Sequence, residues 1–258
     1  MIRDAARRRF LSLEVPRGAR VLDAPCGDGS ITAELRAAGY DAHGIDAVDS
    51  GGSSALGAAF HLGDLNAPIP WPDSSFDAAL SIEGIEHLEN RFAFLRELHR
   101  VLKPGAPLLV TTPNIASLRS RVRFFGSTFY HRDTRPLREA ARHPLHHIAL
   151  ATPADLRYAL HTSGFRLTAV GHTHIKPVSY AYAWLAPWMW IYTTVAFRKE
   201  TDPTQRRANR EIRSALFSKS VLFGENLMLT CLRDAREAQR APDYSGEIDG
   251  RPQSSQRR

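Results

Sequence analysis

Short apolar runs alternate with helix-forming segments through the first 112 residues, and this alternation constrains the fold of the chain most strongly. One such segment, 91–102, carries its apolar side chains on one helical stripe and ends at Lys103-Pro104-Gly105. The Gly- and Ser-rich stretch 50–54 predicts a short or degraded crossover helix. The apolar runs have the length and composition of strands, and they lie at 19–23, 40–46, 58–62, 76–82 and 108–112. Strands that alternate with helices form βαβ units, so the sequence predicts a parallel sheet covered by helices on both faces.

The second half of the chain is less regular and predicts two further strands, 165–170 and 221–232. Thr152 as N-cap and Pro153 at the first helical position predict a helix before the first of them. The sequence therefore predicts one α/β domain with two insertions and a polar, disordered tail. We expect the domain at 1–232, a cap insertion at 113–150, an apolar and charged insertion at 176–219, and the tail at 233–258.

Cysteine usage and the N-terminal sequence bear on the compartment of the protein. Cys26 and Cys231 stand too far apart in the chain to form a disulfide framework, which favours a reducing environment. The arginine-rich stretch 1–10 lacks the apolar run and the cleavage site of a signal peptide. We therefore expect a cytoplasmic protein. The formal net charge of +7 comes mostly from arginine and identifies no partner by itself.

A Gly-rich turn follows the first predicted strand and leads into a helix. It reads Ala24-Pro25-Cys26-Gly27-Asp28-Gly29, and a turn of this kind brings backbone N–H groups close to a ligand at the carboxyl edge of the sheet. The dinucleotide-binding fingerprint would need a further glycine where Thr32 stands. Further motifs follow in order along the chain, at Gly44-Ile45-Asp46, Gly63-Asp64-Leu65 and Glu86-His87-Leu88.

Together these motifs resemble the class I S-adenosylmethionine-dependent methyltransferases of type 11 or 23, over roughly residues 15–112. Pro25 replaces the first glycine of the family's first motif, which removes one backbone donor from the turn. The resemblance implies a Rossmann-like sheet of seven strands whose last strand, 221–232, is antiparallel. It also implies S-adenosyl-L-methionine as the cofactor.

The same resemblance assigns the residues that surround the cofactor. Asp23, Gly27 and Gly29 are expected around its methionine part, and Asp46 at the ribose hydroxyls. Asp64 and Leu65 are expected at the adenine, and Ala47 is a further cofactor-binding residue. A carboxylate at the end of the second strand can accept from both ribose hydroxyls, as in other nucleotide-binding α/β sheets. Each aspartate could instead be a solvated loop residue or a helix cap. Cys26 is expected to be a small packing residue, since methyl transfer from a sulfonium needs no covalent intermediate.

Catalysis requires an acceptor in line with the methyl–sulfur bond, exclusion of water and, for a hydroxyl acceptor, removal of a proton. The resemblance points to a histidine just before the Thr-Pro-x-x-Leu helix start at 152–156, which favours His147 as the base and His146 next. His87, after the fourth strand, is the third candidate. Each could instead be a partly buried histidine that satisfies a backbone carbonyl. No cluster of His, Asp and Glu has convincing metal-ligand spacing, so no metal site is expected.

The cap insertion, 113–150, is rich in arginine. It holds only two acidic residues against seven arginines: Arg119, Arg121, Arg123, Arg132, Arg135, Arg138 and Arg142. This excess predicts either contact with phosphate or carboxylate groups of an anionic partner or a solvated helix face.

The second insertion contains an uncharged stretch, 177–197, with three tryptophans and three tyrosines. Its length would suit a transmembrane helix. However, the final strand must return to the sheet, and 198–219 is too polar to cross back. The stretch is therefore expected to be an interfacial membrane anchor, a dimer or cap contact, or ordinary core.

The sequence thus predicts a methyltransferase that O-methylates a glycan or lipid-linked intermediate at the inner face of the membrane. Thr112-Pro113-Asn114 and Leu222-Phe223-Gly224-Glu225 are similar to methyltransferases of cell-surface polysaccharide pathways. The alternatives are a small-molecule or quinone-type O-methyltransferase and a catalytically degenerate, membrane-associated scaffold. The intact Asp23, Gly27, Gly29 and Asp46 count against the scaffold. A nucleic-acid methyltransferase is not expected, because Ser81-Ile82-Glu83-Gly84 stands where an Asn/Asp-Pro-Pro-Tyr-like tetrapeptide would follow the fourth strand.

Overall fold

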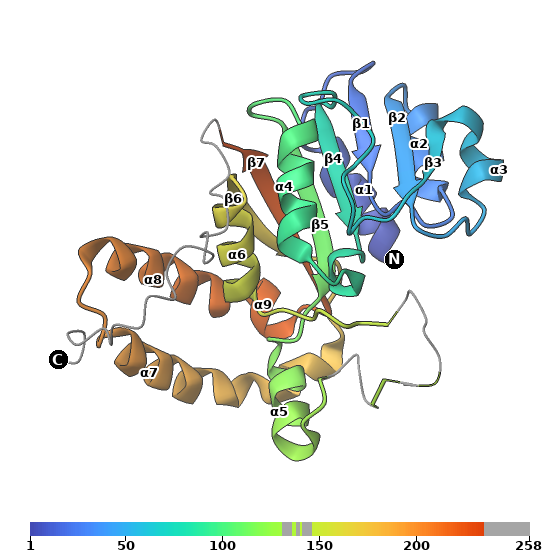
Figure 1. Cartoon of the computed structure of the whole chain (residues 1–258). Helices are drawn as coiled ribbons and strands as arrows, with labels where there is room; N and C mark the ends of the chain where they lie inside the picture. The colour runs from blue at the N-terminus through green and yellow to red at the C-terminus, as the bar shows by residue number, and fades with distance from the viewer. Residues whose placement is uncertain (131–135, 138–139, 141–145, 235–258) are drawn as a thin grey trace.

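A seven-stranded sheet in the order β3-β2-β1-β4-β5-β7-β6 forms the centre of the computed structural model, which describes residues 1–130, 136–137, 140 and 146–234 (Figure 1). The strands are β1 Arg20–Asp23, β2 Asp41–Asp46, β3 Phe60–Leu62, β4 Ala78–Ile82, β5 Pro107–Pro113, β6 Phe165–His172 and β7 Asn226–Arg233. The first five pair in parallel, and β7 runs antiparallel to both β5 and β6. The predicted α/β fold with an antiparallel last strand is confirmed.

Helices occupy most of the segments between the strands. They are α1 Ile2–Leu11, α2 Ser30–Ala37, α3 Gly52–Leu56, α4 Arg91–Val101, α5 Leu118–Ser127, α6 Pro153–Thr162, α7 Ala186–Phe197, α8 Pro203–Leu216 and α9 Lys219–Phe223, with 3-10 helices η1 Gly57–Ala59, η2 Ile85–His87 and η3 Pro177–Leu185. The crossover helix α3 has five residues, as its Gly- and Ser-rich composition predicts. α6 begins with a capping box, in which Thr152 Oγ1 accepts from the Asp155 N–H and the Asp155 carboxylate accepts from the Thr152 N–H.

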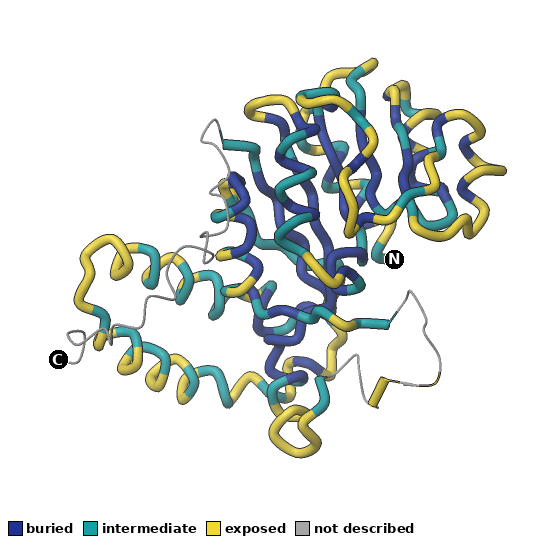
Figure 2. The backbone as a smooth tube through the Cα atoms, in the orientation of Figure 1, coloured by how far each residue is buried: buried dark blue, intermediate teal, exposed yellow. Residues whose placement is uncertain are grey.

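Alternate residues of the central strands face two hydrophobic cores, one on each side of the sheet. Leu22 and Ala79 belong to the core that the sheet shares with α4 and α6. Val21 and Leu80 belong to the opposite core, with α1 and α2. Because side chains of a strand alternate between faces, strands that are buried on both sides are continuously apolar, which made them recognisable in the sequence. Figure 2 shows the sheet as the most buried part of the molecule.

The last strand begins later than the sequence predicts. Its expected range was 221–232, but 219–223 form α9, whose first turn is capped by Ser218 Oγ accepting from the Val221 N–H. A short apolar run fits a strand and a buried helix equally well, and the cap favours the helix here. β7 therefore starts at Asn226.

The end of β7 also bears on the predicted tail over 233–258. Arg233 is the last residue of the strand, and the Asp234 N–H donates to the Gly164 carbonyl at 2.8 Å. The rest of the expected tail lies outside the described residues.

The insertion between β6 and β7 forms a helical arm, the name used below for 177–216. η3 leads into α7, and α8 returns beside α7 toward the sheet (Figure 1). Neither α7 nor α8 contains a buried residue, and Figure 2 shows both in the colours of exposed and intermediate positions. Ordinary core is therefore the wrong interpretation of α7. Among the described residues, no helix is long and apolar enough to cross a membrane.

Candidate active site

A cleft at the carboxyl edge of the sheet gathers most of the predicted site residues. Its volume is about 1270 Å³, and its walls include the ends of β1, β2 and β4 and the start of α1. Six of the seven residues expected at the cofactor line it: Asp23, Gly27, Asp46, Ala47, Asp64 and Leu65. The carboxyl ends of parallel strands meet at one edge of a sheet, and open α/β sheets bind their ligands there.

Gly29, the seventh expected residue, does not line the cleft. It is the N-cap of α2 with a φ of 75°, and a Cβ at this position would lie 3.0 Å from the side chain of Leu56. Gly27 has a φ of 58° and no atom near its Cβ position, and its N–H donates to Asp46 Oδ2 at 2.8 Å. The turn therefore uses Gly29 for packing against α3 and Gly27 for a left-handed backbone at the cleft wall.

Cys26 and Asp28 behave as local structural residues of the same turn. Burial raises the pKa of the Cys26 thiol, which suits a packing residue and not a nucleophile. The Asp28 carboxylate accepts from Arg3 at 2.8 Å and from the Ser30 N–H at 3.1 Å, and the Arg3 interaction lowers its pKa.

Asp23 is the most unusual ionisable group of the cleft. Asp23 is 1% exposed, and its Oδ2 accepts from the Thr32 hydroxyl at 2.7 Å. Its Oδ1 is buried and has no hydrogen-bond partner among the described residues. Burial raises the pKa of this carboxyl to about 7, against the lowering effect of the Thr32 hydrogen bond. A carboxyl held in this way can accept a strong hydrogen bond from a cationic donor in the cleft.

Asp46 joins the end of β2 to the Gly-rich turn. Besides the bond from Gly27, its Oδ1 accepts from the Val48 N–H at 3.1 Å. The residue remains partly exposed to the cleft. Each carboxylate oxygen can accept a second hydrogen bond, so Asp46 can organise the turn and still receive ligand hydroxyls.

Asp64 and Leu65 form the far wall of the cleft. Leu65 is 3% exposed and offers an apolar surface, whereas Asp64 is exposed. Asp64 Oδ1 accepts from the Asn66 N–H at 2.9 Å and from Asn66 Nδ2 at 3.0 Å. The side chain therefore shapes its own loop at the wall of the cleft.

The three candidate histidines lie together, but not all of them line the cleft. His87 and His146 are in its wall, and His87 Nδ1 donates to the His146 carbonyl at 3.0 Å. The ring of His147 packs against that of His87, with centroids 4.9 Å apart. His147, the first choice from the sequence, is not among the residues that line the cleft.

Comparisons with known proteins agree with this geometry. A family model described as a methyltransferase domain matches residues 3–170 of the chain. The chain belongs to this methyltransferase family. Membership implies methyl transfer as the chemistry and S-adenosylmethionine as the cofactor, as the sequence motifs do.

Individual relatives of the methyltransferase are distant. A probable S-adenosylmethionine-dependent methyltransferase from Mycolicibacterium smegmatis is 30% identical over 154 residues, which is 58% of this chain and 53% of that protein. A ubiquinone biosynthesis O-methyltransferase from Maricaulis maris is 27% identical over 66% of this chain and 68% of its own length. The chain thus spans little more than half the length of the first of these relatives.

Solved structures support the same fold. A putative methyltransferase from Bacillus halodurans superposes with a TM-score of 0.54 at 16% identity, covering 88% of this chain and 98% of its own. An S-adenosylmethionine-dependent methyltransferase from Archaeoglobus fulgidus gives a TM-score of 0.53 at 16% identity, covering 89% and 94%. At this level of identity the likeness concerns the fold alone.

The cleft of the methyltransferase fits S-adenosylmethionine in its residue chemistry. The buried Oδ1 of Asp23 is an acceptor without a protein donor among the described residues, which suits the ammonium of the methionine part. Asp46 and Leu65 add a carboxylate and an apolar wall, which would hold a ribose and an adenine. When bound, this cofactor supplies an activated methyl group, and the protein's task is to position the acceptor.

A cluster at the edge of the cleft was not expected from the sequence. Glu86, His87 and His147 each offer a ligand atom, and these atoms all lie within 4.8 Å of one another. Carboxylate and imidazole are ligands for divalent cations, so this cluster could hold a metal ion, contrary to the expectation of no metal site. Glu86 and His87 are adjacent, but about sixty positions separate them from His147, so the spacing gave no signal.

Glu83 is a further cleft residue, and in the sequence it is one of the carboxylates that follow the fourth predicted strand, where a base is expected. Its φ is 50°, its Oε1 accepts from Thr111 Oγ1 at 3.0 Å, and its Oε2 accepts from Asn226 Nδ2 at 2.5 Å. These contacts tie β4 to β5 and β7 at the carboxyl edge. Its place immediately after a buried strand is the signal that points to it in the sequence.

The arginines of the cap insertion divide between structural contacts and positions that are not described. Arg119 pairs with Glu225 at 3.3 Å, and the Arg121 guanidinium donates to the Ala116 carbonyl at 2.7 Å and contacts Met189 of α7 at 3.4 Å. Arg123 is exposed. The other four lie outside the described residues: Arg132, Arg135, Arg138 and Arg142.

Proposed function

We propose that this methyltransferase transfers a methyl group from S-adenosylmethionine to an oxygen of a glycan or lipid-linked acceptor, as a cytoplasmic protein peripheral to the inner face of the membrane. The observation that carries this proposal is an exposed apolar surface at the same edge of the sheet as the cofactor cleft. We call this surface the aromatic face, and its residues come from α5 and the helical arm: Phe124, Phe125, Trp184, Trp188, Trp190, Ile191 and Tyr192.

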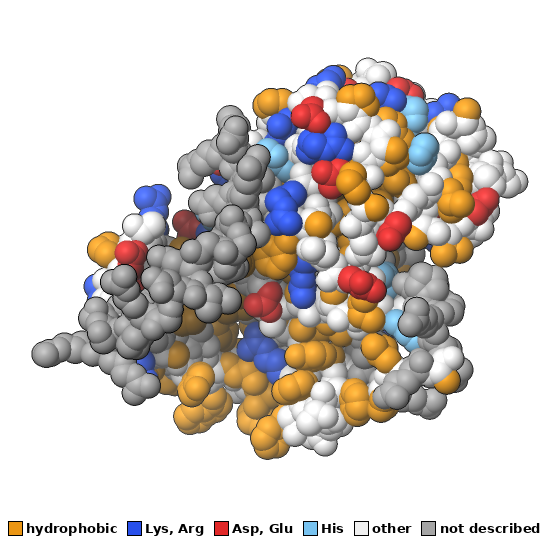
Figure 3. All heavy atoms as spheres, in the orientation of Figure 1, with side chains coloured by type: hydrophobic (Ala, Val, Ile, Leu, Met, Phe, Trp, Pro, Cys, Tyr) orange, Lys and Arg blue, Asp and Glu red, His pale blue; other side chains and the backbone are white. Residues whose placement is uncertain are grey.

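The aromatic face is large and unusually exposed. Phe125 is 94% exposed, Trp188 70% and Tyr192 78%. Figure 3 shows hydrophobic side chains gathered over α5 and α7 at one end of the molecule. Contiguous apolar patches of this kind mark protein or membrane contacts in soluble proteins. Tryptophan and tyrosine favour the membrane interface, where one ring edge stays hydrated.

The topology brings the aromatic face to the cleft edge. β5 runs parallel to β4, so its carboxyl end lies at the same edge as the ends of β1, β2 and β4 that form the cleft. Four residues after β5 the chain enters α5, which packs on η3. An acceptor anchored in a membrane beneath the aromatic face would therefore approach the carboxyl edge, where the cofactor binds.

Within the cleft, His87 is the base that this proposal favours. Its Nδ1 donates to a carbonyl oxygen, which can only accept, so the neutral ring carries its proton on Nδ1. Nε2 then has the lone pair that can take a proton from an acceptor hydroxyl. Asp23 and Asp46 would hold the cofactor while His87 and His146 border the acceptor side.

The test is methyl transfer from labelled S-adenosylmethionine to fractionated cell-envelope precursors. We expect label in a glycan- or lipid-containing fraction, and a turnover about 10²- to 10⁴-fold lower for His87→Gln with unchanged cofactor affinity. His161→Gln, at an exposed position of α6, is the matched control and should leave turnover unchanged. Loss of turnover in His147→Gln but not in His87→Gln would identify His147, the residue that the sequence favours, as the base.

A quinone-type acceptor is the second candidate, favoured by the similarity to a ubiquinone biosynthesis O-methyltransferase. A quinone precursor is apolar and would also reach the cleft from a membrane. Label that appears only in the quinone fraction would support this candidate and contradict the glycan or lipid-linked acceptor.

A further inference from the structure

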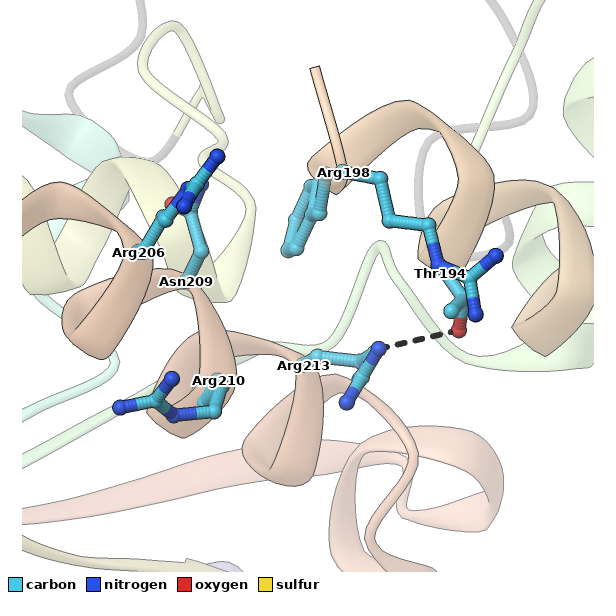
Figure 4. Close-up of a pocket in the computed structure, with 7 residues that line it drawn as sticks. Thr194, Arg198, Arg206, Asn209, Arg210 and Arg213 are labelled. Carbon is cyan, nitrogen blue, oxygen red and sulfur yellow. Dashed lines mark hydrogen bonds between the residues drawn. The ribbon is translucent and has the colours of Figure 1, made fainter. Parts of the chain in front are cut away.

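A second cavity lies between the two long helices of the helical arm. Its volume is about 250 Å³, and its walls include Thr194, Phe197 and Arg198 from α7 and its end, and Arg206, Arg210 and Arg213 from α8 (Figure 4). The three α8 arginines are spaced by four and three positions, which puts them on one face of the helix. Figure 4 shows Arg213 reaching across to Thr194, and its guanidinium donates to Thr194 Oγ1 at 3.1 Å.

The four guanidinium groups of this cavity have no acidic counterpart in its wall. None of them forms an ion pair with any residue that the structure describes. Arg206 donates instead to the backbone carbonyl of Glu200 at 2.6 Å. Four like charges around a small cavity repel one another, and an anion in the cavity would remove that cost.

The acidic residues of the arm are engaged elsewhere. The Glu200 carboxylate accepts from the N–H groups of Thr201 and Asp202, and Asp202 caps α8 at the Gln205 N–H. Glu211 pairs with Arg157 of α6 at 2.6 Å. Among the described residues, no carboxylate of the arm therefore balances the positive charge of the cavity.

Phosphate suits this geometry, because guanidinium groups bind it bidentately and its several oxygens can accept from more than one arginine. The cavity is also joined to the aromatic face. The Arg213 guanidinium lies over the Trp190 ring, 5.5 Å from its centroid, and Trp190 itself is 47% exposed on that face. A ligand in the cavity would thus lie at the level where exposed indole rings meet charged groups, which is the composition of a membrane interface.

We propose that the arginine cavity between α7 and α8 binds the headgroup phosphate of an anionic phospholipid when the aromatic face contacts a membrane. This inference rests on the membrane contact of the proposed function, but not on the methyl acceptor. The aromatic side chains would supply apolar contact, and the four arginines would supply selectivity for anionic lipid.

The test is flotation of the intact chain with phosphatidylcholine vesicles and with vesicles that also contain phosphatidylglycerol. Arg198→Gln/Arg206→Gln removes two charges from the cavity, and Lys199→Gln/Arg207→Gln removes two charges from neighbouring exposed positions that do not line it. We expect the first pair to weaken binding to anionic vesicles about 30-fold, because each substitution removes a charge-assisted contact with the phosphate worth about 1 kcal/mol. The control pair should lose less than about fivefold, and circular dichroism should be unchanged in both.

Each other outcome overturns the proposal in a distinct way. Equal losses in the two pairs would mean diffuse attraction without a site. Flotation that does not depend on phosphatidylglycerol would show that the membrane contact needs no anionic headgroup. Calorimetric binding of inorganic phosphate without any flotation would make the cavity a site for soluble phosphate. None of these results involves methyl transfer, so a failure here is distinguishable from a failure of the proposed acceptor.

Discussion

At the scale of single residues, Asp23 combines the two properties that a cofactor-binding carboxyl needs. Thr32 fixes one oxygen, and the other is buried in the cleft wall without a donor among the described residues. This arrangement costs stability when the carboxyl ionises, because burial raises its pKa to about 7. A cationic ligand would recover that cost, so the site is organised for a charged partner.

The raised pKa of Asp23 predicts opposite effects of pH on stability and on cofactor affinity. Between about pH 4 and 7 the unfolded chain releases the proton and the folded chain keeps it, so the stability of the ligand-free protein should fall as pH rises. Over the same range, affinity for S-adenosylmethionine should rise by up to about tenfold per pH unit, because the carboxylate is the form that binds a cation. Urea unfolding and calorimetric titration across this range measure both effects.

Asp23→Asn is the variant that isolates these effects. It should lose the fall of stability with pH and weaken cofactor binding at pH 8, with the pH dependence of affinity removed. Asp28→Asn is the control, since Arg3 lowers the pKa of that carboxyl and its titration lies below this range. An Asp23→Asn protein whose affinity keeps the same pH dependence would place the titrating group elsewhere.

At the scale of elements, the two glycines of the turn before α2 have different tasks. Gly29 packs against Leu56, and Gly27 lines the cleft. Gly29→Ala should lower the free energy of unfolding by about 1–2 kcal/mol for its left-handed φ and by about 1 kcal/mol more because Leu56 must move. Gly18 also has a left-handed φ, 77°, but no atom lies near its Cβ position. Gly18→Ala should therefore lower the free energy of unfolding by the backbone contribution alone. Denaturant midpoints compare the two, and equal losses would mean that the Leu56 contact is unimportant.

Most elements of the first half could be predicted because the central strands β1, β4 and β5 are buried on both faces and the helices carry their own periodic and capping signals. β1 and α4 follow from continuous or periodic apolar residues, and the motif spacing carries Asp23 and Asp46 to one edge. The second half has weaker local signals. α9 was mistaken for the start of β7. Which of the three histidines line the cleft depends on the path of the chain before α6, which periodicity does not set. The packing of α8 against α7 depends on tertiary contacts that no local pattern encodes.

At the scale of the whole molecule, one edge of the sheet serves two purposes. It ends in the cofactor cleft on the side of β1, β2 and β4, and it leads through β5 into α5 and the aromatic face. A protein that has to meet a membrane-held acceptor benefits from this proximity, because membrane contact then also orients the cleft. The same apolar surface could instead bury itself against a second copy of the chain, and the two arrangements differ in what they predict for the free protein.

Replacing Trp184 and Trp188 by serine separates these arrangements. Both side chains are more than 60% exposed, at 67% and 70%, so the variant should fold normally and lose only external contacts. We expect the intact protein to be a monomer by light scattering and to float with anionic vesicles, with flotation reduced but not abolished by salt, because screening does not affect apolar contact. The tryptophan variant should stay at the bottom of the gradient, whereas Tyr158→Ser, an exposed aromatic position on α6, should float like the intact chain. If the intact protein instead runs as a dimer that the tryptophan variant dissociates, the aromatic face is a subunit contact, and a membrane has no part in presenting the acceptor.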